Sequence, residues 1–361
     1  MRLKSLELRD FRNYKSVKID FSDGINILWG KNAQGKTNIL EAIYFLATAR
    51  SFRTIDRKSL ISWNGDRFLL GCKIGNGAEK RLRILFSNSE RKASLNSKRV
   101  NKLSDLIGIL RVVIFTPEDI FLLKGNPFKR RRFLDICISQ IDREYVGVLQ
   151  KFKQVLIRRN FAIRKYGNRS SSFLWDNQLA ESVAFIMGRR KEVIARIAEK
   201  ADEYHRDITS GKERLRIEYK PSVKTKEISE KEIFAHYEKN RKKDSEELCT
   251  TTGPHRDDID FFINGKDVKL FGSEGQQRSA VLSLKNAEFA LMKKETKETP
   301  LILADDVLPV LDRERKRAFL PSLKGNAQIF ITCTDKRDIE SIGAKANVFR
   351  VFNGNVARER V

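Results

Sequence analysis

Apolar positions in the first fifty residues change their spacing several times, and each spacing predicts an element. Within residues 3–8 and 17–21 apolar side chains partly alternate with polar ones, as in half-buried strands, and residues 12–14 form the turn between them. Residues 25–29 form an apolar run that indicates a buried strand. Apolar residues at helical spacing over 37–48 predict a helix. The chain therefore opens with strands and one helix.

The rest of the chain shows a long helical region between two strand-rich regions. Strand patterns occupy 68–74, 80–86 and 111–115, helical periodicity dominates 126–206, and a charged helix is predicted at 231–248. Strand patterns return at 259–263, 301–304, 328–332 and 348–352. We therefore expect an α/β head formed by residues 1–125 plus 250–361, with a mainly helical insertion lobe over 126–249.

Composition narrows the class of protein. The 361 residues carry 72 Lys and Arg against 47 Asp and Glu, a net charge of +25, which favours nucleic acid or an anionic membrane as partner, or a charge kept for solubility. Apolar runs are too short to cross a bilayer, and the first residues lack the apolar stretch of a signal peptide. The four cysteines stand far apart, so neither a disulfide framework nor a zinc site is indicated. We expect a cytoplasmic protein with no membrane partner.

Basic residues gather in the expected helical lobe. Residues 145–175 hold seven basic and no acidic side chains, and residues 129–132 read Lys-Arg-Arg-Arg. A solvated helix face normally mixes both signs of charge, so this bias favours DNA phosphates as the partner. The residues expected to contact DNA are Arg130, Arg131, Lys151, Lys153, Arg158 and Arg159.

The segment after the strand at 25–29 fits the phosphate-binding pattern G-x-x-x-x-G-K-[ST]. Its place between a strand and a helix is the context that this pattern requires. Backbone N–H groups of such a loop surround phosphate oxygens, the ammonium of Lys36 reaches the β- and γ-phosphates, and the Thr37 hydroxyl completes a Mg²⁺ shell. We expect ATP to contact Gly30, Lys31, Asn32, Ala33, Gln34, Gly35, Lys36, Thr37 and Asn38.

A second acidic site follows the strand at 301–304. Asp305 and Asp306 stand at its carboxyl end, the edge at which parallel sheets bind ligands. We expect Asp305 to hold Mg²⁺ and Asp306 to orient or deprotonate the attacking water. The alternative is a simple helix cap after a core strand.

A glycine-containing turn at 271–278 opens a helix and lies between these two motifs in the sequence. A helix N-terminus with a free hydroxyl, here that of Ser273, is a potential second anion site or an ordinary capped helix. Lys36 and Asp305 are 269 residues apart, too far for a simple P-loop switch. Placed before Asp305, the turn resembles the signature motif of the ABC ATPase superfamily.

With these motifs the chain resembles the RecF family, bacterial recombination mediators and DNA replication and repair proteins related to the heads of SMC proteins. The matching segments run in order over nearly the whole chain: residues 11–14, 30–41, 49–54, 115–119, 124–125, 130–135, 253–258, the Ser273 turn and 305–307. The resemblance implies an ABC-type P-loop ATPase head, with a mixed sheet beside a central P-loop sheet and a helical inserted lobe.

The resemblance also implies a function. ATP binds the P-loop of one subunit and the signature turn of another, which adds Arg12, Gly275 and Gln276 to the ATP contacts and gives Ser273 a catalytic role in trans beside Lys36 and Asp306. The implied protein is an ATP-dependent clamp that dimerises on gapped, single-stranded or double-stranded DNA and helps to load recombinase. RecR and RecO are its implied partners, and ATP and Mg²⁺ its cofactors.

Some positions depart from the family pattern or stay open. The family's Ser-Glu-Leu-Asp reads Pro309-Val310-Leu311-Asp312, its frequent histidine is Phe52, and no histidine follows the strand at 328–332, which favours slow ATP hydrolysis. His205 and His236 are expected in solvent, while the loop at 253–258 is either functional or a structural turn. The alternatives are an ABC transporter ATPase subunit, an SMC-like structural protein and a nuclease-fused ATPase.

Overall fold

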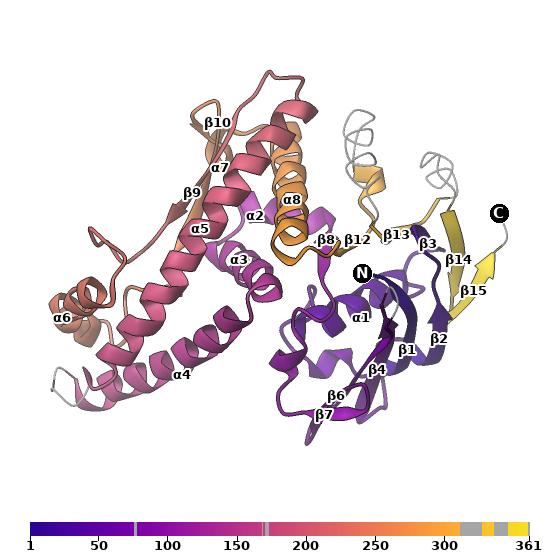
Figure 1. Cartoon of the computed structure of the whole chain (residues 1–361), viewed down its shortest axis with the longest axis horizontal. Coiled ribbons are helices and arrows are strands. Elements are labelled where there is room, and N and C mark those ends of the chain that lie inside the picture. Colours follow the sequence, from indigo (N-terminus) through magenta and orange to yellow (C-terminus); the bar gives the residue numbers. More distant parts are fainter. Residues whose placement is uncertain (76–77, 168, 170–172, 311–326, 336–345, 360–361) are drawn as a thin grey trace. The chain divides into compact units, whose positions relative to one another are not determined.

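The chain packs as two compact units (Figure 1). One unit comprises Met1–Asp119 with Glu288–Val361, here called the head unit, and the other comprises Ile120–Ala287, the helical unit. The boundary falls within helix α8 (Glu274–Thr296). The computed structural model describes residues 1–75, 78–167, 169, 173–310, 327–335 and 346–359.

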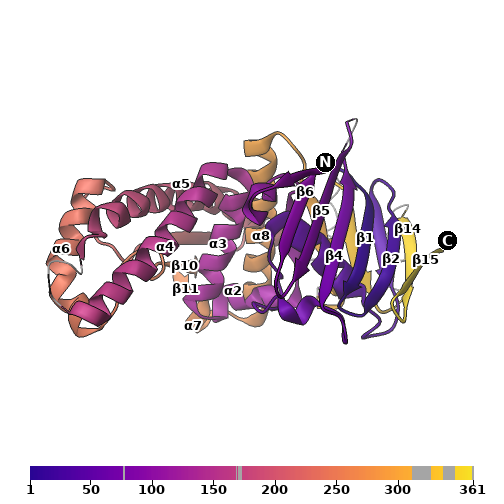
Figure 2. The same cartoon turned by 90° about the horizontal axis from the view of Figure 1, so that it is seen from below.

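One layer of the head unit is a six-stranded antiparallel sheet, whose strands lie side by side in Figure 2. Buried and exposed residues alternate along its strands because one face packs on the core and the other meets solvent. In order across the sheet the strands are β2 (Tyr14–Asp20), β1 (Leu3–Phe11), β4 (Arg67–Ile74), β5 (Lys80–Ser87), β6 (Arg91–Leu95) and β7 (Lys98–Val100).

The other layer of the head unit is a mostly parallel sheet. Its central strands are continuous apolar runs because both of their faces are covered. The order is β15 (Asn355–Glu359), β14 (Ala346–Phe352), β3 (Ile25–Trp29), β13 (Ile329–Cys333), β12 (Leu301–Ala304) and β8 (Val112–Phe115), and only β15 runs antiparallel to its neighbour. The parallel pairing places the carboxyl ends of β3, β12 and β13 at one edge.

Helix α1 (Lys36–Thr48) packs against strands of both sheets, β4 and β5 of one and β8 and β13 of the other. From Ile39 to Thr48 all of its side chains are buried. The predicted helix is therefore covered by protein on every side over these residues. Short helical turns complete the head unit: η1 (Lys58–Leu60), η2 (Leu103–Leu106) and η5 (Leu308–Val310).

The helical unit is built around helix α5 (Asp176–Ile208), against which α4 (Arg143–Tyr166) and α6 (Glu230–Glu246) pack. A small antiparallel sheet in the order β11 (Lys266–Asp267), β10 (Asp258–Ile263), β9 (Leu215–Lys220) packs beside α5 through β9. Asn264 and Gly265, both with positive φ, form the tight turn between β10 and β11. The other described helices of this unit are α2 (Phe121–Lys124), α3 (Pro127–Ile141) and α7 (Val268–Phe271), and η3 (Pro117–Ile120) crosses the boundary between the two units.

The α/β fold class expected from the sequence is confirmed, and the grouping of residues differs at two places. Residues 120–125 and 250–287, both expected with the head, pack with the helical unit. The cause is pairing: β10 forms its ladder with β9, and the guanidinium of Arg130 on α3 donates to both carboxylate oxygens of Asp258 at 2.6 and 2.9 Å. The strands predicted from the sequence do not include β9, although Leu215 and Ile217 alternate with charged residues along it.

Candidate nucleotide-binding site

The loop after β3 adopts a conformation that its two glycines make possible. Gly30 has φ +155°, and a Cβ there would lie 2.3 Å from the carbonyl oxygen of Val351. Gly35 has φ +109°, and a Cβ there would lie 2.6 and 2.7 Å from atoms of Asn13 and 2.7 Å from the Tyr14 hydroxyl. Both positions exclude a side chain, which is the physical reason for glycine at the two fixed points of the motif.

Neighbouring strands hold this loop in place. The Asn13 amide donates to the Gln34 carbonyl at 2.9 Å, and the Tyr14 hydroxyl donates to the Gly35 carbonyl at 3.0 Å. The Asn353 N–H, from the turn after β14, donates to the Gln34 side chain at 2.8 Å. The loop is therefore braced where helix α1 begins, and the helix N-terminus adds its own preference for an anion.

Lys36 places its ammonium group over the loop. Its Nζ donates to the carbonyls of Gly30 at 2.7 Å and Lys31 at 3.0 Å. Burial lowers the pKa of Lys36, and the nearby charges of Asp306 and Asp305 act in the opposite direction. Among the described residues its direct hydrogen-bond partners are these two carbonyl oxygens, and a buried cation so placed can attract phosphate oxygens.

The two acidic positions meet the P-loop through hydroxyl groups. The Thr37 hydroxyl donates to Oδ1 of Asp305 at 2.8 Å, and the Thr332 hydroxyl, from the end of β13, donates to the same oxygen at 2.9 Å. Burial raises the pKa of Asp305, while these two hydrogen bonds lower it. A nearly buried carboxylate beside a threonine hydroxyl is an oxygen donor set that suits Mg²⁺.

Asp306 takes up an uncommon backbone conformation beside this group. Its φ is +47°, in the left-handed region that Asp tolerates better than most residues. Its N–H donates to the Thr332 hydroxyl oxygen at 2.8 Å, which holds the turn. Thr332 thus contacts both acidic residues, the carboxylate of Asp305 and the backbone of Asp306, and neither motif nor spacing had marked it. Asp312 of the downstream Pro309–Asp312 segment lies outside the described residues.

Glu41 is a second residue that motif reasoning missed. Its side chain is fully buried on α1, and the Arg12 guanidinium donates to both of its oxygens at 2.9 and 2.8 Å. Ser51 also donates to Glu41, and Arg53 lies 3.6 Å from it. Arg12 is thereby held against α1, the helix that follows the P-loop, and its contact with ATP stays a prediction. The one feature of the sequence that could have identified Glu41 is that it is a single acidic residue within the apolar stretch of α1.

The signature turn belongs to the helical unit and is preorganised. The Ser273 N–H donates to Oε1 of Gln276 at 2.9 Å, and the Gln276 N–H donates to the Ser273 hydroxyl oxygen at 3.2 Å. This reciprocal arrangement is a capping box, which fixes the first turn of α8. The Gln276 amide also donates to Glu213 at 2.8 Å. Ser273 is exposed and Gly275 half-buried.

Three of the residues expected to contact DNA are otherwise engaged, and for Arg159 the prediction is wrong. The Arg159 side chain is fully buried, and its guanidinium donates to Asp176 at 2.7 Å and to Asp244 at 2.7 Å. Arg130 is 4% exposed and paired with Asp258, so it is not available to a phosphate either. Arg131 is half-buried and donates to the Asp257 carbonyl at 2.8 Å. A buried guanidinium requires such partners, which α5, α6 and β10 supply.

The other three expected DNA contacts are exposed on α4. Lys151 pairs with Glu181 at 2.7 Å, Lys153 is exposed, and the Arg158 guanidinium lies 5.4 Å from the centre of the Trp175 ring. Their role in binding DNA stays a prediction.

The histidines differ from expectation. His205 is fully buried, not in solvent: its Nε2 lies 3.1 Å from Glu213, and burial lowers its pKa. His236 is half-buried, with Nε2 3.1 Å from the Thr252 hydroxyl. In the 253–258 loop Asp257 is buried and accepts hydrogen bonds from Arg190 and Ser222, which favours the structural alternative.

The fold and the site together define an ABC-type P-loop nucleotide-binding head. Residues 2–357 match the RecF/RecN/SMC N terminal domain family. The chain is 40% identical over 362 residues to the DNA replication and repair protein RecF of Clostridium acetobutylicum, covering 99% of both, and 40% identical over 370 residues to that of Bacillus cereus, covering 99% and 98%. The chain belongs to the RecF family.

Solved structures agree with this assignment. The recombination mediator protein RecF-ATP of the RecFOR pathway superposes with a TM-score of 0.91 at 32% identity, covering 99% of this chain and 97% of that one. An Smc head domain from Pyrococcus furiosus superposes with a TM-score of 0.55 at 18% identity, a likeness of fold alone. In the described part of the chain no helix is long and apolar enough to cross a membrane.

Proposed function

We propose that this protein is an ATP-driven switch that binds DNA and helps to load recombinase during repair and replication. The observation that carries the proposal is the contact of Thr37 with Asp305, which joins a complete P-loop to the second acidic motif in a chain that matches RecF proteins over its whole length. The transporter, SMC-arm and nuclease alternatives gain no support from any structural observation or comparison.

Different residues of the head unit have different roles in ATP hydrolysis. The P-loop N–H groups and Lys36 bind the phosphates, and Asp306 accepts a proton from the attacking water. Thr37 and Asp305 would hold Mg²⁺, which supplies positive charge to the phosphate oxygens. We expect slow hydrolysis because no histidine follows β13.

Dimerisation joins two incomplete halves. The P-loop belongs to the head unit and the signature turn to the helical unit, and we propose that Ser273, Gly275 and Gln276 of one copy cover the ATP held by another. DNA then lies on a surface assembled from two copies. RecR and RecO act as partners in the same pathway.

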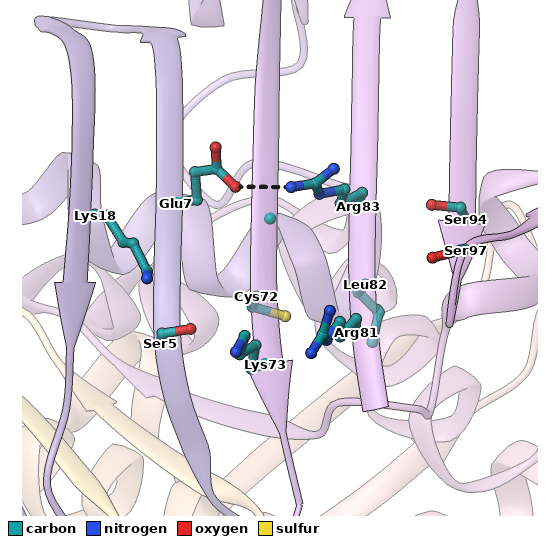
Figure 3. Close-up of a pocket in the computed structure, with 11 residues that line it drawn as sticks. Ser5, Glu7, Lys18, Cys72, Lys73, Arg81, Leu82, Arg83, Ser94 and Ser97 are labelled. Carbon is teal, nitrogen blue, oxygen red and sulfur yellow. Dashed lines mark hydrogen bonds and ion pairs between the residues drawn. The ribbon is translucent and has the colours of Figure 1, made fainter. Parts of the chain in front are cut away.

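The outer face of the antiparallel sheet is the part of the head unit that we propose for DNA, together with the exposed basic residues of α4. A hollow of about 560 Å³ lies on this face, and Lys18, Lys73, Arg81 and Arg83 are among its lining residues (Figure 3). Gly71 contributes no side chain to its floor. Arg83 pairs with the lining residue Glu7 at 3.3 Å, and Lys73 and Arg81 pair with Glu79 at 3.5 and 3.1 Å, so DNA phosphates would compete with these carboxylates. A row of cations above a glycine leaves room for a phosphate backbone.

The experiment is a gel shift on duplex and gapped DNA with and without ATP. The proposal expects ATP to tighten binding. ATP-independent binding, or none at all, would contradict it.

A further inference from the structure

Two apolar side chains stand in solvent immediately before the signature turn. Leu270 and Phe271, at the end of α7, are each 71% exposed. Their backbone is fixed: the buried Gln277 side chain donates to the carbonyls of Val268 at 3.2 Å and Gly272 at 2.9 Å, and the Gly272 N–H donates to the Val268 carbonyl at 3.1 Å. A rigid, exposed apolar pair of this kind is typical of an interface.

The P-loop side of the molecule carries a matching pair. Ile55 is 75% exposed and Trp63 is 95% exposed. Ile55 lies two residues after Arg53, whose guanidinium donates at 2.8 Å to Asn38 on α1. The segment that holds Trp63 is anchored by the Ser62 N–H, which donates at 2.9 Å to the Asp10 carbonyl beside Arg12. Both apolar residues are thus tied to elements that support the P-loop.

We infer that Leu270 and Phe271 of one copy pack against Ile55 and Trp63 of a second copy when ATP joins the two. The inference rests on the proposed dimerisation and deepens it by naming the apolar contacts that flank the nucleotide. A copy that brings its P-loop to Ser273 of its partner also brings Ile55 and Trp63 toward the partner's Phe271 and Leu270, which lie two and three positions before that serine.

The occupant is a second copy because the two apolar pairs adjoin the two halves of the proposed ATP site, and charge explains why such a pairing needs apolar contacts. Each chain has a net charge of +25, so two copies repel one another. Bound nucleotide offsets only a small part of that repulsion. Apolar contact supplies attraction that does not depend on charge, and in a symmetric pair each contact occurs twice. The two exposed pairs lie on opposite halves of the composite site, as a self-complementary interface requires.

The test compares exposed-residue variants by sedimentation equilibrium of the full chain with a slowly hydrolysed ATP analogue. Phe271→Ser and Trp63→Ser should each raise the dimer dissociation constant about 100-fold, because each removes one large apolar burial from both ends of a symmetric interface. ATP binding to the monomer, measured by equilibrium dialysis, should not change.

Leu174→Ser is the matched control. Leu174 is 73% exposed in the helical unit and has no place in the inferred contact, so its substitution should leave dimerisation unchanged. If the wild-type chain dimerises and Phe271→Ser and Trp63→Ser dimerise equally well, the inference is wrong while the proposed function stands. If the wild-type chain stays monomeric with nucleotide, both are wrong.

A cross-link distinguishes this pairing from other occupants. In a Cys249→Ser background, Phe271→Cys and Trp63→Cys in one chain should form an intermolecular disulfide under mild oxidation only with nucleotide. Cross-linking without nucleotide would overturn the pairing. A Trp63→Ser variant that dimerises normally but binds DNA more weakly as a monomer would also overturn it and would indicate another occupant.

Discussion

The hydroxyl of Thr37 donates a 2.8 Å hydrogen bond to the carboxylate of Asp305, a residue 268 positions later in the chain. The parallel pairing of β3 with β13 and of β13 with β12 makes this contact possible, because it places the loop after β3 and the residues after β12 at one edge of the sheet. Thr332 at the end of the intervening strand bonds to the same oxygen. The site is therefore a property of the sheet, not of either motif alone.

Lys36→Met should weaken ATP binding by about ten- to a hundredfold, since charge-assisted hydrogen bonds are worth roughly 1.5–3 kcal/mol. Isothermal titration calorimetry measures the change. Lys31→Met is the control: the Lys31 side chain is exposed in the same loop, and the expected contact of this residue with ATP is through its backbone N–H, which the substitution keeps, so the effect should be small. Equal losses in the two variants would show that general charge, not the placed ammonium, attracts the nucleotide.

Asp306→Asn should keep ATP bound but reduce hydrolysis by about a hundredfold or more, because an amide cannot accept the water's proton. The dimer should then persist after ATP is added. Phosphate release and sedimentation measured on the same sample check both parts. Normal turnover in this variant would remove Asp306 from the assigned role.

Asp305→Asn should stabilise the nucleotide-free protein at neutral pH. Burial raises the pKa of Asp305, so the folded state binds its proton more readily than the unfolded state does. The resulting contribution to stability is full below the ordinary Asp pKa and is lost as pH rises through the raised value. The advantage of the variant should accordingly shrink as pH falls.

Urea unfolding between pH 4 and 8 measures this advantage. The Asn side chain can still accept from Thr37 and Thr332, so the comparison isolates the charge. Asp20→Asn, at an exposed carboxylate, is the control. A variant less stable than wild type at pH 7 would contradict the cause assigned to the shift.

Glu41→Gln should destabilise the protein by about 3 kcal/mol, because it leaves the Arg12 guanidinium without its buried counter-charge. Arg12→Gln should cost a similar amount, and the double variant should cost clearly less than the sum. Chemical denaturation of the four proteins completes the cycle. Additive losses would mean that the two residues act independently.

The sequence predicts the site where chemistry demands fixed residue types. A phosphate loop needs glycines, a lysine and a hydroxyl at set intervals, so Gly30, Gly35, Lys36 and Thr37 can be recognised without a structure. Long apolar runs likewise report the buried parallel strands and so most of the fold. Glu41 and Thr332 could not be found in this way, because their roles depend on partners brought together only by folding.

Arg159 shows how a charge pattern misleads. It stands in a run without acidic residues, which favours a DNA surface, yet it also continues the helical spacing of the buried Phe152 and Val155. Its partners Asp176 and Asp244 come from α5 and α6. The sequence around Arg159 therefore does not show that these two carboxylates compensate its charge. Helical phase was the better guide to its position than charge.

The central claim is that ATP joins two copies through the P-loop of one and Ser273 of the other, and that DNA binds the assembled surface. Its most direct test is a salt titration of duplex DNA binding with and without ATP, for wild type and Ser273→Arg. The log–log slope falls by about 0.9 for each phosphate contact, so pairing should make wild-type binding tighter and about twice as steep with ATP. Ser273→Arg should bind ATP but keep the shallow slope. Identical wild-type slopes in both states, or a variant that keeps the ATP-dependent gain, would contradict the account.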